Sequence, residues 1–178
     1  NNSGFNNTAS GYQALLSNKG GFNNSGNGVS ALLSNTTGFN NTADGFTALQ
    51  NNTTGNGNTA VGDGALAGNT SGSNNIGVGI SAGLNLTTGS NNIDIGASVT
   101  GTAGEANTIR IGKQGTQKKT FVAGVRGVTV PSGVGVIVGT TGQLGTVVSS
   151  ARFKEAIKPM DKTSETILAL KPVTFRYK

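Results

Sequence analysis

The first hundred residues repeat one pattern of small, polar and apolar positions with a constant 17-residue period. Glycine occupies two phases of this pattern, beginning at Gly4 and Gly11, and each glycine column keeps the step through six units. Alanine from Ala14 and leucine from Leu15 fill two more phases. A fifth column consists of Asn7, Asn24, Asn41, Asn58, Asn75 and Asn92. Five columns in phase indicate a repeat architecture.

The unit has the length of one solenoid coil. Two-helix repeats need about 33 residues or more, and glycine, asparagine and threonine disfavour helix. We therefore predict an all-β fold over residues 1–112, a β-solenoid (β-roll) with two short strands and two tight turns in each coil. In the strand around Ala60, alternation turns Thr59 and Val61 to one face and Ala60 to the other.

Stacking such coils places equal residues above one another, about 4.8 Å apart. The asparagine column then becomes a ladder of side-chain amides, and the alanine and leucine columns form a thin core. One thin coil would leave Phe5, Phe22, Phe39 and Phe46 facing water. We therefore predict that copies of the chain associate in parallel, as a homotrimer.

The composition changes after the repeats, and residues 113–148 are predicted to form a β-rich, intertwined trimeric neck. Thr120–Val130 and Val134–Val138 are rich in β-branched residues and are candidate strands. Thr141–Thr146 has the composition of a turn that leads into a third strand.

Residues 149–178 are predicted to begin an α+β domain. Asp161 and Thr163 are candidate caps for a short helix over Glu165–Leu170, which Pro172 would end. Val173–Tyr177 alternates as a strand does. We expect the chain to be a piece of a longer protein, since it begins in mid-pattern and stops early in this domain.

Composition excludes several kinds of chemistry. Only 34% of residues are hydrophobic, so one deep core is not expected, and there is no Cys or His. This rules out disulfides, zinc sites and histidine-based catalysis. We expect no metal and no cofactor, because Asp44, Asp63 and Asp94 are too sparse for calcium loops. The most apolar window, Gly127–Val148, is interrupted by polar residues and Pro131, so no membrane insertion is expected.

Charge divides the chain in two. Residues 1–104 carry a net charge of −2 and residues 105–178 a net charge of +8. The basic half includes Lys113, Lys118 and Lys119, which would suit nucleic acid or lipid phosphate. No aromatic residues interleave with these lysines, so we interpret them as a solvated basic collar and expect no nucleic-acid partner.

The repeats resemble the head repeats of trimeric autotransporter adhesins, whose units read about Gly-x-Asn-Ala-x-Ala-Ile-Gly. The most similar stretches here are Gly57–Ala65 and Asn74–Gly79. This resemblance implies a trimeric, left-handed β-roll at a cell surface. The 17-residue unit of this chain is longer than the adhesin unit.

The last thirty residues resemble the start of the peptidase S74 domain, the intramolecular chaperone of endosialidases and other phage tail spikes and fibres. Residues 149–154 read Ser-Ser-Ala-Arg-Phe-Lys, and the family pattern is Ser-Asp-x-Arg-x-Lys. A Leu-x-Pro-Val-x-Phe strand follows at residues 170–175. Ser149, Arg152 and Lys154 match the pattern, whereas Ser150 replaces the common Asp.

The S74 resemblance implies that the assembled trimer cuts itself between Ser149 and Ser150. Ser149 would be the nucleophile, Lys154 its base, and Arg152 a supporting cation. A Ser-Lys pair is a known alternative to the Ser-His pair. Burial and a neighbouring cation would lower the pKa of the lysine. Any enzymatic activity would therefore be a single turnover on the chain itself.

We accordingly expect a segment of a trimeric tail fibre or adhesin, on a virion or a cell surface, whose partners are copies of itself and a host-surface glycan or protein receptor. Two alternatives stay open. The chain could be the stalk of a tail-spike enzyme with an upstream catalytic head, or the subunit of a bacterial surface adhesin or self-assembling filament.

Overall fold

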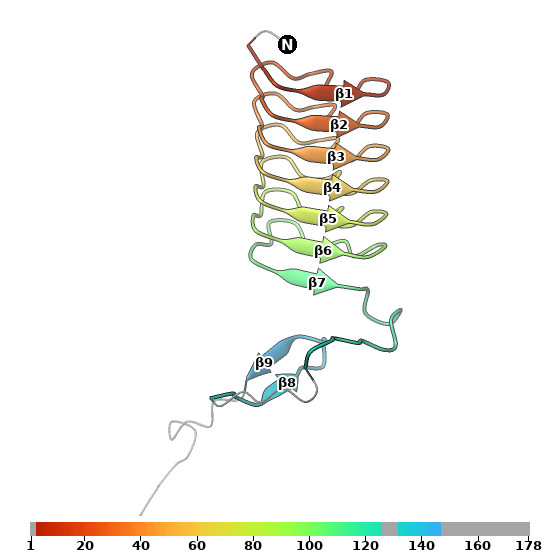
Figure 1. Cartoon of the computed structure of the whole chain (residues 1–178), viewed down its shortest axis with the longest axis vertical. Helices are drawn as coiled ribbons and strands as arrows, with labels where there is room; N and C mark the ends of the chain where they lie inside the picture. Colours follow the sequence, from red (N-terminus) through yellow and green to blue (C-terminus); the bar gives the residue numbers. More distant parts are fainter. Residues whose placement is uncertain (1–2, 126–131, 147–178) are drawn as a thin grey trace, which may run out of the picture. The chain divides into compact units, whose positions relative to one another are not determined.

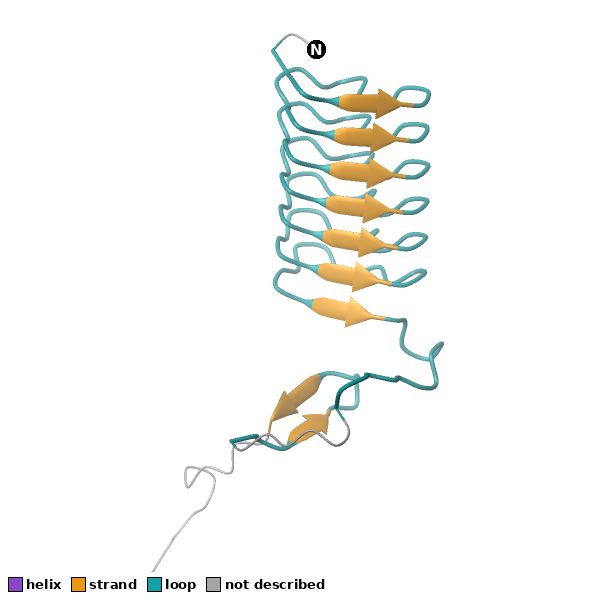
Figure 2. Cartoon of the chain, viewed as in Figure 1, coloured by secondary structure: helices purple, strands orange, loops and turns teal. Residues whose placement is uncertain are grey.

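The computed structural model describes residues 3–125 and 132–146 and divides the chain into two compact units, Asn1–Ala123 and Gly124–Lys178. In the first unit, seven short parallel strands stack in chain order into one sheet (Figures 1 and 2). The strands are β1 (Thr8–Ser10), β2 (Ser25–Asn27), β3 (Thr42–Asp44), β4 (Thr59–Val61), β5 (Ile76–Val78), β6 (Ile93–Ile95) and β7 (Ile109–Ile111).

The register of the strands confirms the predicted solenoid. Ala43 pairs with Ala60, its equivalent in the next repeat, and the same step joins each pair of neighbours from β1 to β6. The step from β6 to β7 is one residue shorter, because Ile93 pairs with Ile109. Each turn of the chain thus places one repeat on the next, and the described part of the chain contains no helix.

The prediction of two strands in each coil is wrong, because each complete coil contains one strand of three residues. The rest of the coil is a series of turns. In the third coil, Gly45, Thr47 and Leu49 have φ values of 143°, 53° and 50°. Left-handed backbone at alternate residues turns the chain repeatedly and prevents a second extended segment.

The core consists of the alanine and leucine columns, as the sequence predicted. Leu32, Leu49 and Leu66 are fully buried, and the alanines that precede them are equally inaccessible. The strands add a further inward column, in which Ala60 is fully buried while Val61 remains 39% exposed. The alternation predicted around Ala60 is therefore confirmed.

The fifth coil fills the core in a different way. Gly83 occupies the phase of Leu66, and Leu86 occupies the phase of Asn69. Leu86 is fully buried, and a Cβ atom on Gly83 would lie 2.5 Å from Cδ2 of Leu66. The leucine has moved three residues along the coil, and a glycine makes room for it.

In the second unit, β8 (Val136–Val138) and β9 (Leu144–Thr146) form an antiparallel hairpin. β8 lies within the predicted strand Val134–Val138, whereas β9 occupies residues that were predicted to form the turn before a third strand. The described part of the other candidate strand, Thr120–Val125, is not a strand, and Gly124 adopts a φ of 78° in a turn there. The helix and strand predicted over residues 161–177 lie outside the described residues, and the division at residues 112 and 148 stays a prediction.

Candidate functional site

The predicted self-cleavage residues lie outside the part of the chain that the structure describes. Ser149, Ser150, Arg152 and Lys154 all fall in the undescribed range 147–178. Their roles stay predictions from the sequence. The sites that can be built from geometry are the ladders of the solenoid, its outward strand face and its last coil.

The predicted asparagine ladder runs through the described solenoid from Asn7 to Asn92. Asn58 shows its geometry: the main-chain N and Nδ2 both donate to Oδ1 of Asn41, at 2.9 and 3.1 Å. Nδ2 of Asn58 also donates to the carbonyl oxygen of Gly72 at 2.8 Å. From Asn24 onward the ladder side chains are buried. Each buried amide is thus bonded to the coils before and after it.

A second buried ladder was missed by the sequence analysis. It consists of Asn18, Asn35, Asn52 and Asn69, which keep the same 17-residue step in the sequence. Nδ2 of Asn52 donates to Oδ1 of Asn35 at 2.8 Å and to the carbonyl oxygen of Gly55 at 3.0 Å. The signal was therefore present in the sequence, as a further asparagine phase.

The two ladders meet at one column of glycine carbonyls. The carbonyl oxygen of Gly38 accepts from Nδ2 of Asn24 at 2.8 Å and from Nδ2 of Asn35 at 3.0 Å. A Cβ atom on Gly38 would lie 2.4 Å from Oδ1 of Asn35 and 2.5 Å from the carbonyl oxygen of Gly55. Glycine is required here because two amides and a carbonyl approach the backbone. These hydrogen bonds hold neighbouring coils together.

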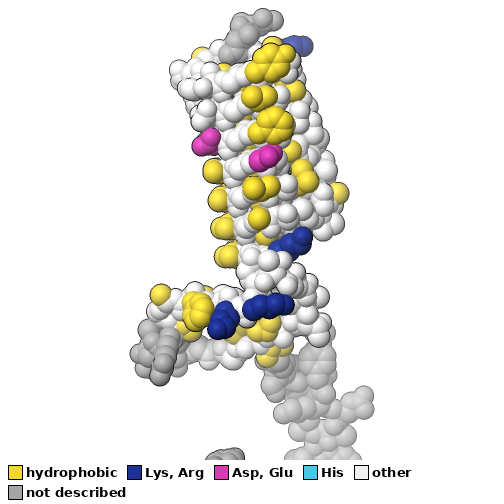
Figure 3. Space-filling model, turned by 90° about the vertical axis from the view of Figure 1, so that its right-hand side faces the viewer, with side chains coloured by type: hydrophobic (Ala, Val, Ile, Leu, Met, Phe, Trp, Pro, Cys, Tyr) yellow, Lys and Arg dark blue, Asp and Glu magenta, His cyan; other side chains and the backbone are white. Residues whose placement is uncertain are grey.

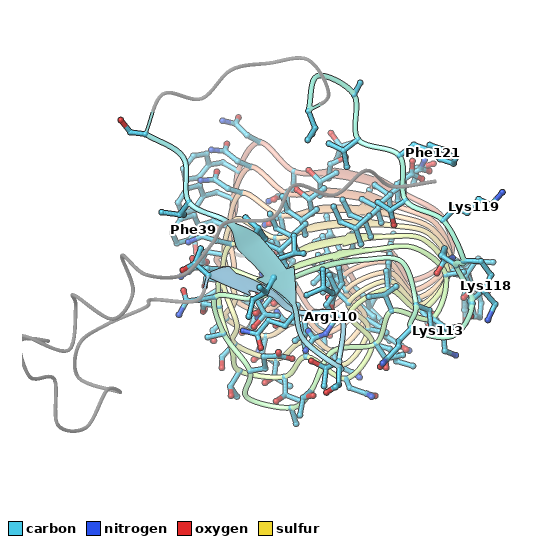
Figure 4. All side chains as sticks on the ribbon, turned by 90° about the horizontal axis from the view of Figure 1, so that it is seen from below. Phe39, Arg110, Lys113, Lys118, Lys119 and Phe121 are labelled. Atoms are coloured by element: carbon cyan, nitrogen blue, oxygen red, sulfur yellow. The ribbon has the colours of Figure 1, made fainter. Side chains whose placement is uncertain are left out.

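An aromatic stack lies beside the first ladder. The rings of Phe5 and Phe22 are 5.0 Å apart and those of Phe22 and Phe39 are 4.7 Å apart, in both cases nearly parallel. Phe5, at the end of the stack, is 57% exposed, whereas Phe22 and Phe39 are half-buried, so these rings cover one another within a single chain. Phe39 is labelled in Figure 4. Phe46 belongs to another column and is 56% exposed.

The outward face of the strands changes character along the solenoid. On β1 to β3 its residues are Thr8, Ser10, Ser25, Asn27, Thr42 and Asp44. Thr59 of β4 is still polar, and from Val61 onward all the outward residues are aliphatic: Val61, Ile76, Val78, Ile93, Ile95, Ile109 and Ile111. Figure 3 shows hydrophobic side chains in stripes along the solenoid. We call the aliphatic residues from Val61 to Ile111 on this face the aliphatic strand face.

The last coil contains a cluster of three charged side chains. Asp94 is fully buried on the inward side of β6, and its Oδ1 lies 3.6 Å from Nη1 of Arg110. Arg110 also pairs with Glu105 through Nη2. Burial raises the pKa of the Asp94 carboxyl, although Arg110 opposes this rise. The hydrogen bond from Arg110 lowers the pKa of Glu105.

The residues around this cluster line a shallow cavity of about 300 Å³, which includes Thr100, Gly101, Arg110 and Lys113. Lys113, Lys118 and Lys119 are exposed (Figure 4), and Nζ of Lys118 donates to the carbonyl oxygen of Gly115 at 3.1 Å. Among the described residues there is no cluster of three metal-ligating side chains and no helix that could span a membrane.

The fold and its ladders define the described chain as a parallel β-solenoid built of repeated coils. No known family model matches the sequence, and neither a curated protein nor a solved structure shows significant similarity to it.

Proposed function

We propose that this chain is a structural and attachment segment of a homotrimeric fibre, on a virion or at a cell surface. The observation that supports this most directly is the stack of near-identical coils, in which each strand pairs only with the strands before and after it. Such a stack gains length with each added coil and does not widen. Its buried ladder amides bond to one another and to glycine carbonyls in neighbouring coils, which suits a structural shaft.

The exposed surface supports association with copies of the chain. The solenoid leaves Val61, Val78, Ile95 and Ile111 between 37% and 76% exposed along one side. Large apolar patches on a soluble protein mark interaction sites. A homotrimer with closed symmetry would cover such a side on every copy. The outer surface of the fibre would then be free to contact a host-surface glycan or protein receptor.

The C-terminal sequence supports a self-releasing assembly domain. Through its resemblance to the S74 domain, the segment from Ser149 would bring three chains together and then be cut between Ser149 and Ser150, with Lys154 as base and Arg152 in support. An assembly domain also meets a physical need. Chains with a 17-residue period can associate one whole coil out of register, and such near-equal alternatives trap folding.

Cleavage tests this proposal. The full-length protein is expected to yield two fragments on denaturing electrophoresis, of which the C-terminal one begins at Ser150. Ser149→Ala and Lys154→Ala should both leave the chain intact, because each removes one half of the catalytic pair. Ser150→Ala is the matched control and should still be cut. An uncut parent chain, or cutting in the Ser149→Ala protein, would contradict the proposed self-cleavage.

A further inference from the structure

We propose that the shallow cavity at the last coil is a binding site for a small carboxylate, held by the backbone N–H of Thr100, the guanidinium of Arg110 and the ammonium of Lys113. The site does not depend on the proposed fibre function, because it belongs to one end of the solenoid and not to its sides. Figure 4 shows the solenoid from this end, with Arg110 and Lys113 labelled.

Two backbone N–H groups beside the cavity are open hydrogen-bond donors. One repeat before Thr100, the N–H of Gly83 donates to the carbonyl oxygen of Val99 in the next coil at 2.7 Å. The last coil offers no such carbonyl, and within the described part of the chain the N–H groups of Thr100 and Gly101 have no hydrogen-bond partner. Both residues line the cavity. Successive free N–H groups of this kind favour an anionic acceptor.

A carboxylate already caps the next N–H of the same segment. Oε2 of Glu105 accepts from the N–H of Thr102 at 3.0 Å, and Oε1 of Glu105 accepts from Nη2 of Arg110. One repeat earlier the equivalent N–H, that of Asn85, donates to the carbonyl oxygen of Thr100. A carboxylate therefore replaces a main-chain carbonyl at this end of the solenoid, and it bridges a backbone N–H to the guanidinium. A ligand carboxylate would repeat this arrangement on the neighbouring donors.

The charges around the cavity favour an anion. The lining contains Arg110 and Lys113 but no acidic side chain. The segment 94–119 carries four basic residues against two acidic ones, Asp94 and Glu105, so its net charge is +2. The guanidinium of Arg110 has five N–H donors in a planar fork that fits a carboxylate. Hydrogen bonds between charged partners are about twice as strong as neutral ones.

The size of the cavity selects a small ligand. Its volume of about 300 Å³ is at the lower end of the range for ligand pockets, about 300–1,000 Å³. Ser98, Thr100 and Gln114 add neutral polar side chains to the lining, which can bond to hydroxyl groups on the body of a ligand. The site therefore fits organic acids from the size of acetate to that of a single acidic sugar.

Amide NMR spectra of the full chain, labelled with ¹⁵N, test the assignment directly. Acetate and glucuronate, each added at constant ionic strength, should shift the amide proton signals of Thr100 and Gly101 downfield until the shift saturates. The reason is that a carboxylate oxygen accepts a hydrogen bond from these N–H groups. Acetamide has nearly the shape of acetate but no charge, and it should give no saturable shift.

A reversal of charge tests the basic side of the cavity. Lys113→Glu should weaken acetate binding at least tenfold, because it replaces an attracting ammonium with a repelling carboxylate. The matched control is Lys119→Glu, which makes the same change at an exposed residue outside the lining and should weaken binding less than threefold. Lys113→Gln, which only removes the charge, should have an effect between the two. The amide spectra also show whether each variant keeps the solenoid.

Each outcome decides the matter. Glucuronate binding at least tenfold more tightly than acetate assigns the site to an acidic sugar, whereas equal affinities assign it to the carboxylate group alone. Sulfate binding as tightly as acetate would overturn the carboxylate assignment. Acetamide shifts equal to those of acetate, or equal losses of affinity in Lys113→Glu and Lys119→Glu, would overturn the site itself. The fibre proposal is unaffected by all of these results.

Discussion

Asn52 donates from Nδ2 to Oδ1 of Asn35 at 2.8 Å, and both side chains are fully buried. The same pairing recurs one coil later, where Nδ2 of Asn69 donates to Oδ1 of Asn52. A buried polar group left without a partner costs about 1–3 kcal/mol. The ladder is therefore a chain of mutually dependent amides, and it makes the stability of each coil sensitive to its neighbours.

Replacing Asn52 with alanine should lower the free energy of unfolding by about 2–4 kcal/mol, since it leaves Oδ1 of Asn35 without its donor and opens a void. Asn51→Ala is the matched control, because Asn51 is the adjacent residue but is exposed. It should change stability by no more than about 0.5 kcal/mol. Urea unfolding measures both, and equal effects would show that the buried ladder does not stabilise the solenoid.

Two glycines of the fourth coil should respond differently to substitution. Gly62 has a φ of 127°, and a Cβ atom there would lie 2.7 Å from the carbonyl carbon and oxygen of Gly79. Gly62→Ala should therefore cost about 3 kcal/mol or more. Gly64 has a φ of 64°, but Ser81 occupies the same phase in the next coil at 55°. Gly64→Ser should cost less than about 1 kcal/mol. Thermal melts of both variants measure the two losses, and a tolerated Gly62→Ala would refute the close stacking of the turns.

The displaced leucine of the fifth coil predicts coupling between two positions. Leu86→Asn removes a buried leucine and should cost about 2–5 kcal/mol. Gly83→Leu should also destabilise, because its Cβ atom would lie 2.5 Å from Cδ2 of Leu66. The double variant restores the pattern of the fourth coil, Leu66 with Asn69. The double variant should lose about 1–3 kcal/mol less stability than the two single variants added together. Strictly additive losses would contradict the idea that Leu86 replaces a leucine at position 83.

The charge cluster of the last coil predicts a pH-dependent loss of stability. Arg110→Met leaves Asp94 buried without its partner and should cost about 3 kcal/mol near neutral pH. Burial already raises the pKa of Asp94, so this carboxyl becomes neutral as the pH falls and the cost should shrink. The lowered pKa of Glu105 also reduces the difference in stability between the two proteins at low pH. The pair of Glu105 with Arg110 stabilises the parent only while Glu105 is ionised, so the parent loses this contribution as the pH falls.

The experiment measures the thermal midpoints of the parent and Arg110→Met proteins from neutral pH down to about pH 4. The difference between the two midpoints should become smaller as the pH falls. The control is Asp94→Asn/Arg110→Met, in which the buried charge is absent. Its difference from the parent should be smaller near neutral pH than that of Arg110→Met alone. If the midpoint of Arg110→Met stays below that of the parent by the same amount at every pH, Arg110 does not stabilise the charged form of Asp94.

The period of the sequence was enough to predict the parallel coils, the ladder through Asn58 and the core around Leu49. These features follow from columns that repeat without interruption, because stacking turns a sequence period into a spatial contact. The single strand per coil was not predicted, since it depends on left-handed backbone at Thr47 and Leu49, residues that rarely adopt it.

Features that break the period were also beyond the sequence analysis. Leu86 fills the core from a phase that belongs to asparagine elsewhere, so the column pattern gives no hint of its burial. Arg110 meets Asp94 only because the last step, from β6 to β7, is one residue shorter than the others. For the candidate cleavage site at Ser149, the sequence pattern remains the whole basis of the prediction, since the described residues end before it.

The amides of both buried ladders point the same way. Asn41 donates to Asn24 and Asn35 donates to Asn18, so one N–H of each amide is directed toward the N-terminal end of the stack and the oxygen toward the C-terminal end. Aligned dipoles of this kind add up, as they do along an α-helix. The first ladder therefore presents its oxygen end, at Asn92, to the last coil, where the N–H of Thr108 caps it and where the cation Arg110 lies.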